Sequence, residues 1–174
     1  MKAEHRSIAQ FGLTVAILAV TTLFTFPHSR AQQASESLAK RLTGTWALIS
    51  ITATRPDGTK EQPYGPGEGT MMFDGNGHYS TQFCSLNRPK YASDNRMKGT
   101  PEEYQATAQG CNTHWGKYTV NGEKQTLTMA IENASFPNWV GVKQTRAFSI
   151  EGEQFQYTGP GSAGGTAVAV WKRK

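Results

Sequence analysis

The sequence has few of the residues that carry metal or nucleophilic chemistry. Only two cysteines occur, Cys84 and Cys111, and only two of the four histidines, His78 and His114, lie beyond residue 31. Cys111 and His114 are three residues apart in a strand-like run, so they face opposite sides, which is poor geometry for metal ligands. There is no Gly-x-Ser-x-Gly motif, and the glycine-rich run 159–165 is not followed by Lys-Ser/Thr. We therefore expect no metal, no cofactor and no phosphate-binding loop.

The N-terminus differs in composition from the rest of the chain. Residues 11–26 form the apolar run FGLTVAILAVTTLFTF, which follows a short basic stretch and precedes Ser29-Arg30-Ala31. This order is typical of a secretory signal peptide, 1–31, cleaved after Ala31. An uncleaved anchor is the alternative, but the run is shorter than the roughly 20 residues that span a bilayer. We expect a periplasmic or extracellular protein without stable membrane insertion after cleavage.

Charge argues against a nucleic-acid partner. Cleavage would remove three of the 18 basic and one of the 13 acidic residues, which leaves a net charge of +3. The only basic cluster is the C-terminal WKRK. Nucleic-acid-binding domains carry a much stronger basic surface. We expect no nucleic-acid partner, and the composition leaves the oligomeric state open.

Strand signals dominate after a polar lead-in at 32–41. We predict eight strands, at 45–53, 69–74, 78–85, 112–120, 125–132, 142–150, 153–158 and 166–173. Tight glycine turns at 75–77, 121–124 and 151–154 alternate with longer links at 54–68, 86–111, 133–141 and 159–165. One end of the molecule should therefore carry tight turns and the other long loops. The pattern predicts an all-β, up-and-down antiparallel barrel over 42–174 that holds one small ligand.

The longest link contains one well-marked helix. Thr100 is the expected N-cap, Pro101 the first helical residue and Glu103 the end of a capping box, and Gly110 ends the helix. Long links of this kind are often functional. The helix is expected either to cover the mouth of the barrel as a lid or to pack against its side.

The first strand opens with Gly44 and Trp46, and in such a barrel Trp46 would plug the floor. Gly-x-Trp occurs here with the segments PYGPGEGTMMFDGNGHYSTQF, GTPEEYQATAQG, WGKYTV, SFPNWVGVKQTRAFSI and VWKR, in that order over about residues 40–174. Together they resemble the bacterial and fungal lipocalin-like domain family. The resemblance implies a calycin-type, eight-stranded barrel in which a basic residue of the last strand, Lys172 or Arg173, packs across Trp46. The family has no agreed function, so it implies no particular chemistry.

The two cysteines lie in the part of the chain expected to be exported, which favours a disulfide over two buried thiols. In the barrel, Cys84 ends the third strand and Cys111 begins the fourth, so a bridge would close the base of the longest link. Closing a loop of this length contributes roughly 3 kcal/mol on the chain-entropy model.

Strand alternation identifies candidate binding residues inside the barrel. Arg146 shares a face with Phe148 and Ile150, where its guanidinium would hold a carboxylate or enolate of a ligand or pair internally with a group such as Glu132. His114 and Tyr118 share one face of the fourth strand, as a base and an acid or as satisfied wall residues. Gln82 is a further polar candidate, although Tyr79, Thr81 and Phe83 are equally able to point inward. Three further candidates lie on the loops of the open rim: Tyr64, Asn138 and Trp139.

These residues support one leading hypothesis and two alternatives. The first is an exported lipocalin-like protein that binds a small, mostly apolar or amphipathic molecule, or an anionic one held by Arg146. The second is a cavity enzyme of the isomerase, cyclase or hydratase kind that uses His114, Tyr118 and Arg146. The third is a structural or interaction module of the cell envelope without a site.

Overall fold

The computed structural model describes residues 29–161 and 164–174. Apart from its last three residues, the expected signal peptide lies outside these ranges. Described strands are β1 (Gly44–Thr54), β2 (Lys60–Glu61), β3 (Gly67–Phe73), β4 (His78–Ser85), β5 (Cys111–Asn121), β6 (Thr126–Ala134), β7 (Lys143–Glu151), β8 (Gln154–Pro160) and β9 (Thr166–Arg173). The helices are α1 (Arg30–Leu42), α2 (Pro101–Gly110) and the 3-10 turn η1 (Pro137–Trp139).

The strands form one antiparallel sheet that closes on itself. The order is β2-β1-β3-β4-β5-β6-β7-β8-β9, and a further pairing of β1 with β9 completes the barrel. All eight predicted strands are confirmed, and the short β2 adds a ninth that pairs with the end of β1. Closure pairs each of the eight long strands on both sides, although β1 and β3 pair only over residues 44–47 and 70–73.

Alternation along the strands directs apolar side chains to the interior. In β8, for example, Phe155 and Tyr157 are buried while the residues between them are exposed. The same pattern in the other strands builds a core of large side chains, many of them aromatic. The largest fully buried side chains of the described residues are Trp46, Trp171, Phe155, Leu42, Met71, Leu127, Met129, Ile131 and Thr81.

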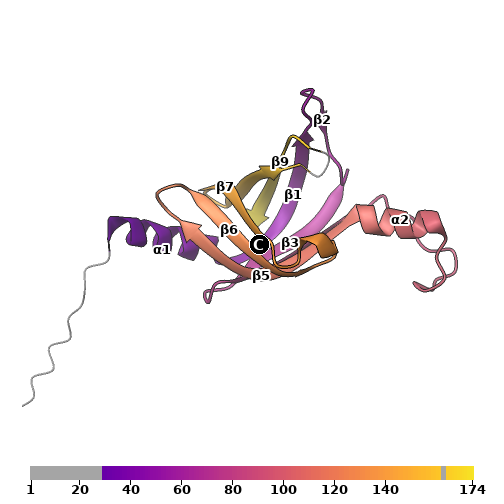
Figure 1. The fold of residues 1–174 in the computed structure, drawn as a ribbon, viewed down its shortest axis with the longest axis horizontal. Coiled ribbons are helices and arrows are strands. Elements are labelled where there is room, and N and C mark those ends of the chain that lie inside the picture. The colour runs from indigo at the N-terminus through magenta and orange to yellow at the C-terminus, as the bar shows by residue number, and fades with distance from the viewer. Residues whose placement is uncertain (1–28, 162–163) are drawn as a thin grey trace, which may run out of the picture.

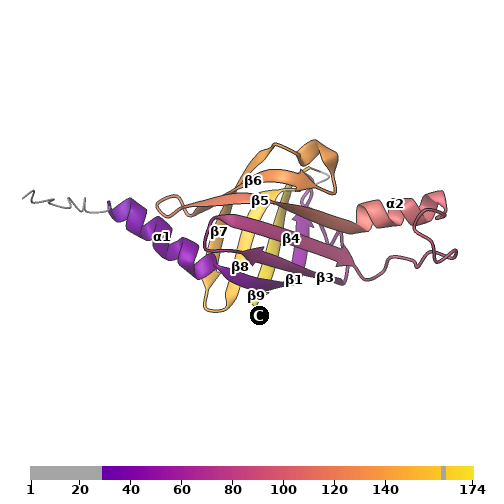
Figure 2. The same ribbon diagram turned by 90° about the horizontal axis from the view of Figure 1, so that it is seen from below.

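The helix α1 lies at one end of the barrel and points outward along the long axis (Figures 1 and 2). It is 13 residues long and includes the whole polar lead-in at 32–41. Its Ser35 Oγ accepts a hydrogen bond from Gly122 N at 2.9 Å, and Arg41 Nη2 donates to Ile150 O at 2.7 Å. Leu42 is fully buried at its C-terminal end. These contacts hold α1 against the tight-turn end of the barrel.

The helix α2 lies at the opposite end of the long axis (Figures 1 and 2). Its capping box is confirmed: Thr100 Oγ1 accepts from Glu103 N, and Glu103 Oε2 accepts from Thr100 N at 2.8 Å. The helix leads directly into β5 and extends away from the barrel. It therefore neither covers the mouth nor packs along the barrel side, because the chain continues from Gly110 into Cys111 without a reversing loop.

Candidate functional site

The closed end is built around Trp46. Its indole Nε1 donates to Leu42 O at 2.8 Å, and the guanidinium of Arg173 lies 4.2 Å from the ring centroid. Arg173 also donates to Thr43 O at 3.0 Å and to Arg41 O, so α1, β1 and β9 are tied together by one side chain. Gly44 leaves room for it: a Cβ there would lie 2.8 Å from Arg173 Nη1, and Gly44 has φ +127. Only glycine adopts such a backbone without strain.

The open half of the barrel contains a second arginine. Arg146, on the inward face of β7, lies over the Tyr157 ring at 5.1 Å from its centroid and donates through Nη2 to Gln144 Oε1. Its Nε is buried and has no hydrogen-bond partner. A Cβ on Gly159 would overlap Nη1 of Arg146, so this glycine of β8 provides the space for the guanidinium.

Arg146 has no acidic partner among the described residues. The ion pairs found there join Arg55 to Glu61 and His78 to Asp74. Glu132, which the sequence offered as an internal partner, is exposed, and the observed partner is the neutral amide of Gln144. Arg146 is partly buried, and withdrawing even part of a guanidinium from water without a counter-charge is costly.

His114 and Tyr79 form a hydrogen-bonded pair inside the barrel, with Tyr79 Oη 2.8 Å from His114 Nδ1. His114 is only 3% exposed. Burial, and then the charge of Arg146, lower the pKa of His114 from 6.5 to about 4. Burial also raises the pKa of Tyr79 above its usual value, so both side chains are neutral at pH 7.

Thr81 is paired with His114 across β4 and β5, and its fully buried hydroxyl has no partner. Buried polar groups are nearly always hydrogen-bonded, so an unpartnered one calls for a partner such as a ligand or a water molecule. The described residues contain four such buried side-chain atoms: Thr81 Oγ1, Asn112 Oδ1, Arg146 Nε and Trp171 Nε1.

The rim residues differ in how close they come to this cluster. The Trp139 ring lies edge-on to His114, with centroids 5.7 Å apart. Tyr64 packs edge-on against Phe83 at 4.8 Å, and burial raises its pKa. Asn138, next to Trp139 in η1, is exposed to solvent. Trp139 therefore belongs to the interior cluster, whereas Asn138 lies outside it.

Two sequence expectations require correction. Gln82 lies on the outer face of β4 and is exposed, because Tyr79, Thr81 and Phe83 occupy the inward positions of that strand. Tyr118 does point inward, but its hydroxyl donates to Asp74 O at 2.8 Å near the tight turns. The partner of His114 is thus Tyr79.

Sequence reasoning missed Gln144 and Gly159, and it left Tyr79 and Thr81 undecided. Gln144 lies two residues before Arg146 and hence on the same face of β7, which is a signal that the alternation already contained. The position of Gly159 opposite Arg146 follows from the pairing of Ala147 with Thr158. That register cannot be read from the separate strands.

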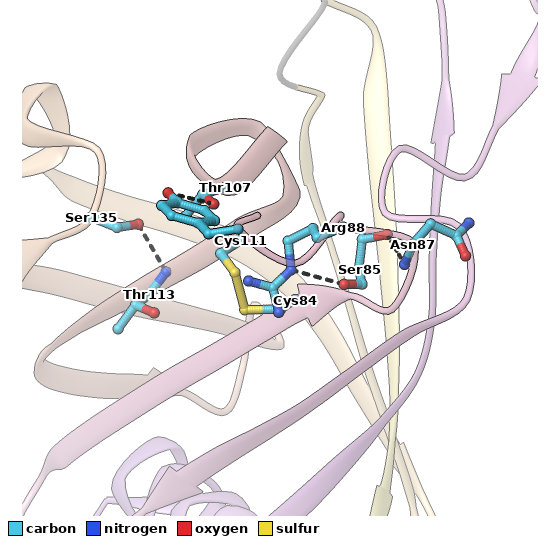
Figure 3. Close-up of a disulfide and its surroundings, with 9 residues drawn as sticks. Cys84, Ser85, Asn87, Arg88, Thr107, Cys111, Thr113 and Ser135 are labelled. Atoms are coloured by element: carbon cyan, nitrogen blue, oxygen red, sulfur yellow. Dashed lines mark hydrogen bonds between the residues drawn. A yellow bond between two sulfur atoms is a disulfide. The ribbon is translucent and has the colours of Figure 1, made fainter. Parts of the chain in front are cut away.

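A disulfide joins Cys84 to Cys111, as the expectation of export favoured (Figure 3). The two residues are directly paired at the open ends of β4 and β5. The bridge closes the base of the segment 86–110, and Arg88 lies beside it, donating through Nε to Ser85 O at 2.9 Å (Figure 3). Its place at the edge of a protruding segment is that of a structural cross-link.

Two hollows lie on the outside of the barrel. One, of about 910 Å³, runs along the segment 86–110 and α2. The other, of about 570 Å³, lies where β1 and β3 separate beyond their paired residues 44–47 and 70–73. No group of three acidic, histidine or cysteine side chains suited to a metal occurs in the described part of the chain. Within residues 29–161 and 164–174, no helix has the length and apolar character needed to cross a bilayer.

An eight-stranded antiparallel barrel, closed at one end by a helix and a Trp–Arg pair and holding polar groups in its open half, defines a lipocalin-like barrel. The family model of the lipocalin-like domain matches residues 43–174, and the chain belongs to this family.

Several solved structures are similar to this chain. A lipocalin-like protein from Bacteroides uniformis is 15% identical with a TM-score of 0.42, the alignment covering 76% of this chain and 98% of that one. A redesigned β-barrel, mFAP1, bound to DFHBI is 20% identical with a TM-score of 0.38, covering 78% and 97%. A point mutant of the fluorescent protein UnaG is 12% identical with a TM-score of 0.37, covering 77% and 96%. Curated proteins give no match.

Proposed function

We propose that this protein is exported and binds, inside its barrel, a small and mostly apolar molecule whose anionic group is held by Arg146. The observation that carries the proposal is the interior guanidinium with an unpartnered Nε and no carboxylate within 4.0 Å among the described residues. An anionic group of a ligand would supply both the missing acceptor and the missing charge.

Neighbouring groups favour the same kind of ligand. The hydroxyl of Tyr79 has one proton and one described partner, His114 Nδ1, so the satisfied arrangement has Tyr79 donating. His114 then carries its own proton on Nε2, which has no described acceptor. The Thr81 hydroxyl is also unpartnered. These interior donors and Arg146 Nε have no described acceptor, and an acceptor-rich group such as a carboxylate or sulfonate would complement them.

Aromatic side chains provide the apolar surface for the rest of the ligand. The Tyr157 ring lies beneath Arg146, and Trp139 lies beside His114 at the rim. Phe83 and Tyr64 extend this surface towards the long links. Rigid aromatic walls with a few placed polar groups are the usual composition of small-molecule sites. Trp139 and Tyr64, both only partly buried, are the proposed entrance.

Binding is favoured over catalysis by the pKa values of the interior pair. A general base must accept a proton near neutral pH, but the pKa of His114 is lowered to about 4. The pKa of Tyr79 is raised, which makes this phenol a poor acid. Both shifts oppose proton transfer between them. Their geometry suits a fixed pair of hydrogen-bonding groups.

Export is the second part of the proposal. The Cys84–Cys111 disulfide supports it, since such bonds persist in oxidising compartments. Cleavage after Ala31 would remove the N-cap Ser29 and the first residues of α1. The contacts that dock this helix, through Ser35, Arg41 and Leu42, would remain.

Paired fluorescent probes test the proposal. 1-Anilinonaphthalene-8-sulfonate (ANS) is an apolar anion, and N-phenyl-1-naphthylamine has the same body without the sulfonate. We expect Arg146→Gln to weaken ANS binding about tenfold or more, because a charge-assisted contact is lost. Binding of the neutral probe should change less than about twofold. Fluorescence titration of the mature protein measures both dissociation constants.

Lys143→Gln is the matched control, because Lys143 lies exposed on the outer face of the same strand. This variant removes the same charge and should leave both dissociation constants unchanged. Equal ANS affinity in the wild type and Arg146→Gln would overturn the anion site. Failure of the wild type to bind either probe would overturn interior binding as a whole.

A further inference from the structure

The segment 86–110, which we call the arm, is internally ordered although it projects from the barrel (Figures 1 and 2). The carboxylate of Glu103 accepts from Ala92 N through Oε1 at 2.8 Å and from Thr100 N through Oε2 at 2.8 Å. Tyr91 packs edge-on against Tyr104, with centroids 5.6 Å apart. The disulfide closes the arm at its base. An arm held in this way presents a defined surface.

That surface exposes apolar side chains that are not part of the barrel core. Met97 is 79% exposed, Leu86 is 58% exposed and Tyr104 is 41% exposed. They lie along the hollow of about 910 Å³. Exposed apolar groups gathered on one feature mark an interaction site, whereas scattered ones need no explanation.

Positive charge accompanies these apolar side chains. In the arm, the four cations Arg88, Lys90, Arg96 and Lys98 all precede α2, and they outnumber the three acids Asp94, Glu102 and Glu103 by one. Arg96 and Lys98 flank Met97 directly, and neither has an acidic partner within 4.0 Å among the described residues. Each oxygen of the Glu103 carboxylate accepts a hydrogen bond from a backbone N–H group of the arm.

We propose that the arm binds the surface of a bilayer that contains anionic phospholipids. A phospholipid presents phosphate beside acyl chain, which complements a cation beside an exposed methionine or leucine. The arm lies at one end of the long axis, opposite α1, so it reaches a flat surface before the barrel does (Figures 1 and 2). This inference is independent of the ligand proposed for the barrel interior.

Vesicle sedimentation tests the inference on the mature, disulfide-bonded protein. The two vesicle types are phosphatidylcholine alone and phosphatidylcholine with about one third phosphatidylglycerol. Each cation near an anionic surface strengthens partitioning about fivefold. We expect binding to the anionic vesicles only, weakened at least about 25-fold by Arg96→Glu/Lys98→Glu. Met97→Ser should weaken it several-fold.

A matched control reverses two exposed cations elsewhere, Lys117→Glu/Lys124→Glu, on the outer face of β5 and in the tight turn beyond it. It makes the same change in net charge and should retain more binding than the arm variant. Equal loss in both variants, or no wild-type binding to the anionic vesicles, would overturn the inference. Binding to an acidic protein without binding to vesicles would assign the arm to a protein partner and would also overturn it.

Discussion

The two ends of the barrel each hold an arginine against an aromatic ring beside a glycine that makes room for it. At the closed end Arg173 lies 4.2 Å from the Trp46 centroid and donates to two backbone carbonyls. In the open half Arg146 lies 5.1 Å from the Tyr157 centroid, donates to one side-chain amide and keeps a buried Nε without a partner. The aromatic contact is thus common to both arginines, whereas the hydrogen-bond acceptors around each guanidinium differ.

On the proposed function, this difference distinguishes a structural arginine, Arg173, from a ligand-binding one, Arg146. The C-terminal carbonyls of α1 point at Arg173, because the last carbonyls of a helix have no partner within it. Arg146 donates to the neutral amide of Gln144, and its charge acts on the hydrogen-bonded pair of His114 and Tyr79, both neutral at pH 7. Arg173 has its acceptors within the fold, whereas the proposed ligand would supply an acceptor to Arg146.

The largest expected effect is the destabilisation of the closed end of the barrel by Trp46→Ala. Trp46 is fully buried and contacts both Arg173 and Phe155. Truncation leaves a large cavity and removes the hydrogen bond to Leu42 O, so the free energy of unfolding should fall by about 3–5 kcal/mol. Urea denaturation measures it. A loss below about 1 kcal/mol would show that Trp46 does not hold the barrel floor.

The next largest effect sharpens the comparison of the two ends through the pH dependence of the free energy of unfolding. His114 has a pKa of about 4 in the folded protein against 6.5 for an unperturbed histidine, so only the unfolded chain takes up its proton between these values. Stability is therefore full above pH 6.5 and falls by up to about 3 kcal/mol as the pH drops to 4.

His114→Gln should remove this part of the slope in urea midpoints measured from pH 7 to pH 4. His78→Gln, which changes an exposed histidine of the β3–β4 turn region, should keep it. An unchanged slope in His114→Gln would show that the buried histidine is not the group that titrates.

The two glycines give a smaller and more selective effect. Gly44 has φ +127 and faces Arg173, so Gly44→Ala should cost about 2 kcal/mol through backbone strain and displacement of the guanidinium. Gly159 has a φ that any residue adopts, and only the flexible end of Arg146 lies in the way. Gly159→Ala should cost less than about 1 kcal/mol but weaken ANS binding several-fold. Similar losses of stability in Gly44→Ala and Gly159→Ala would contradict the proposed difference between the two glycines.

Strand alternation carried most of what the sequence predicted correctly. It gave the eight strands and the inward direction of Arg146, His114 and Tyr118, because a side-chain period of two assigns a whole strand once one face is known. It failed for β4, where Tyr79, Thr81 and Phe83 alternate with Ser80 and Gln82. Polar and aromatic residues occur together there, so the faces are not separated by hydropathy.

The contacts between strands could not be predicted from the sequence. Tyr79 and Tyr118 both point inward, and only the register that pairs Thr81 with His114 brings Tyr79 within 2.8 Å of the imidazole. The direction of α2 likewise depends on how the chain leaves Gly110 for β5. Such features follow from the three-dimensional closure of the barrel, which no single segment encodes.

The most direct test of the anion site compares Arg146→Gln with Arg173→Gln in one experiment that measures the urea midpoint and the ANS dissociation constant of each. Arg173→Gln should lose about 2 kcal/mol of stability, since two hydrogen bonds and the contact with Trp46 are weakened, and should keep its affinity for ANS. Arg146→Gln should lose at least about tenfold in ANS affinity and less than about 1 kcal/mol in stability. If Arg146→Gln instead lost stability like Arg173→Gln and bound ANS like the wild type, both arginines would be structural and the proposed anion site would not exist.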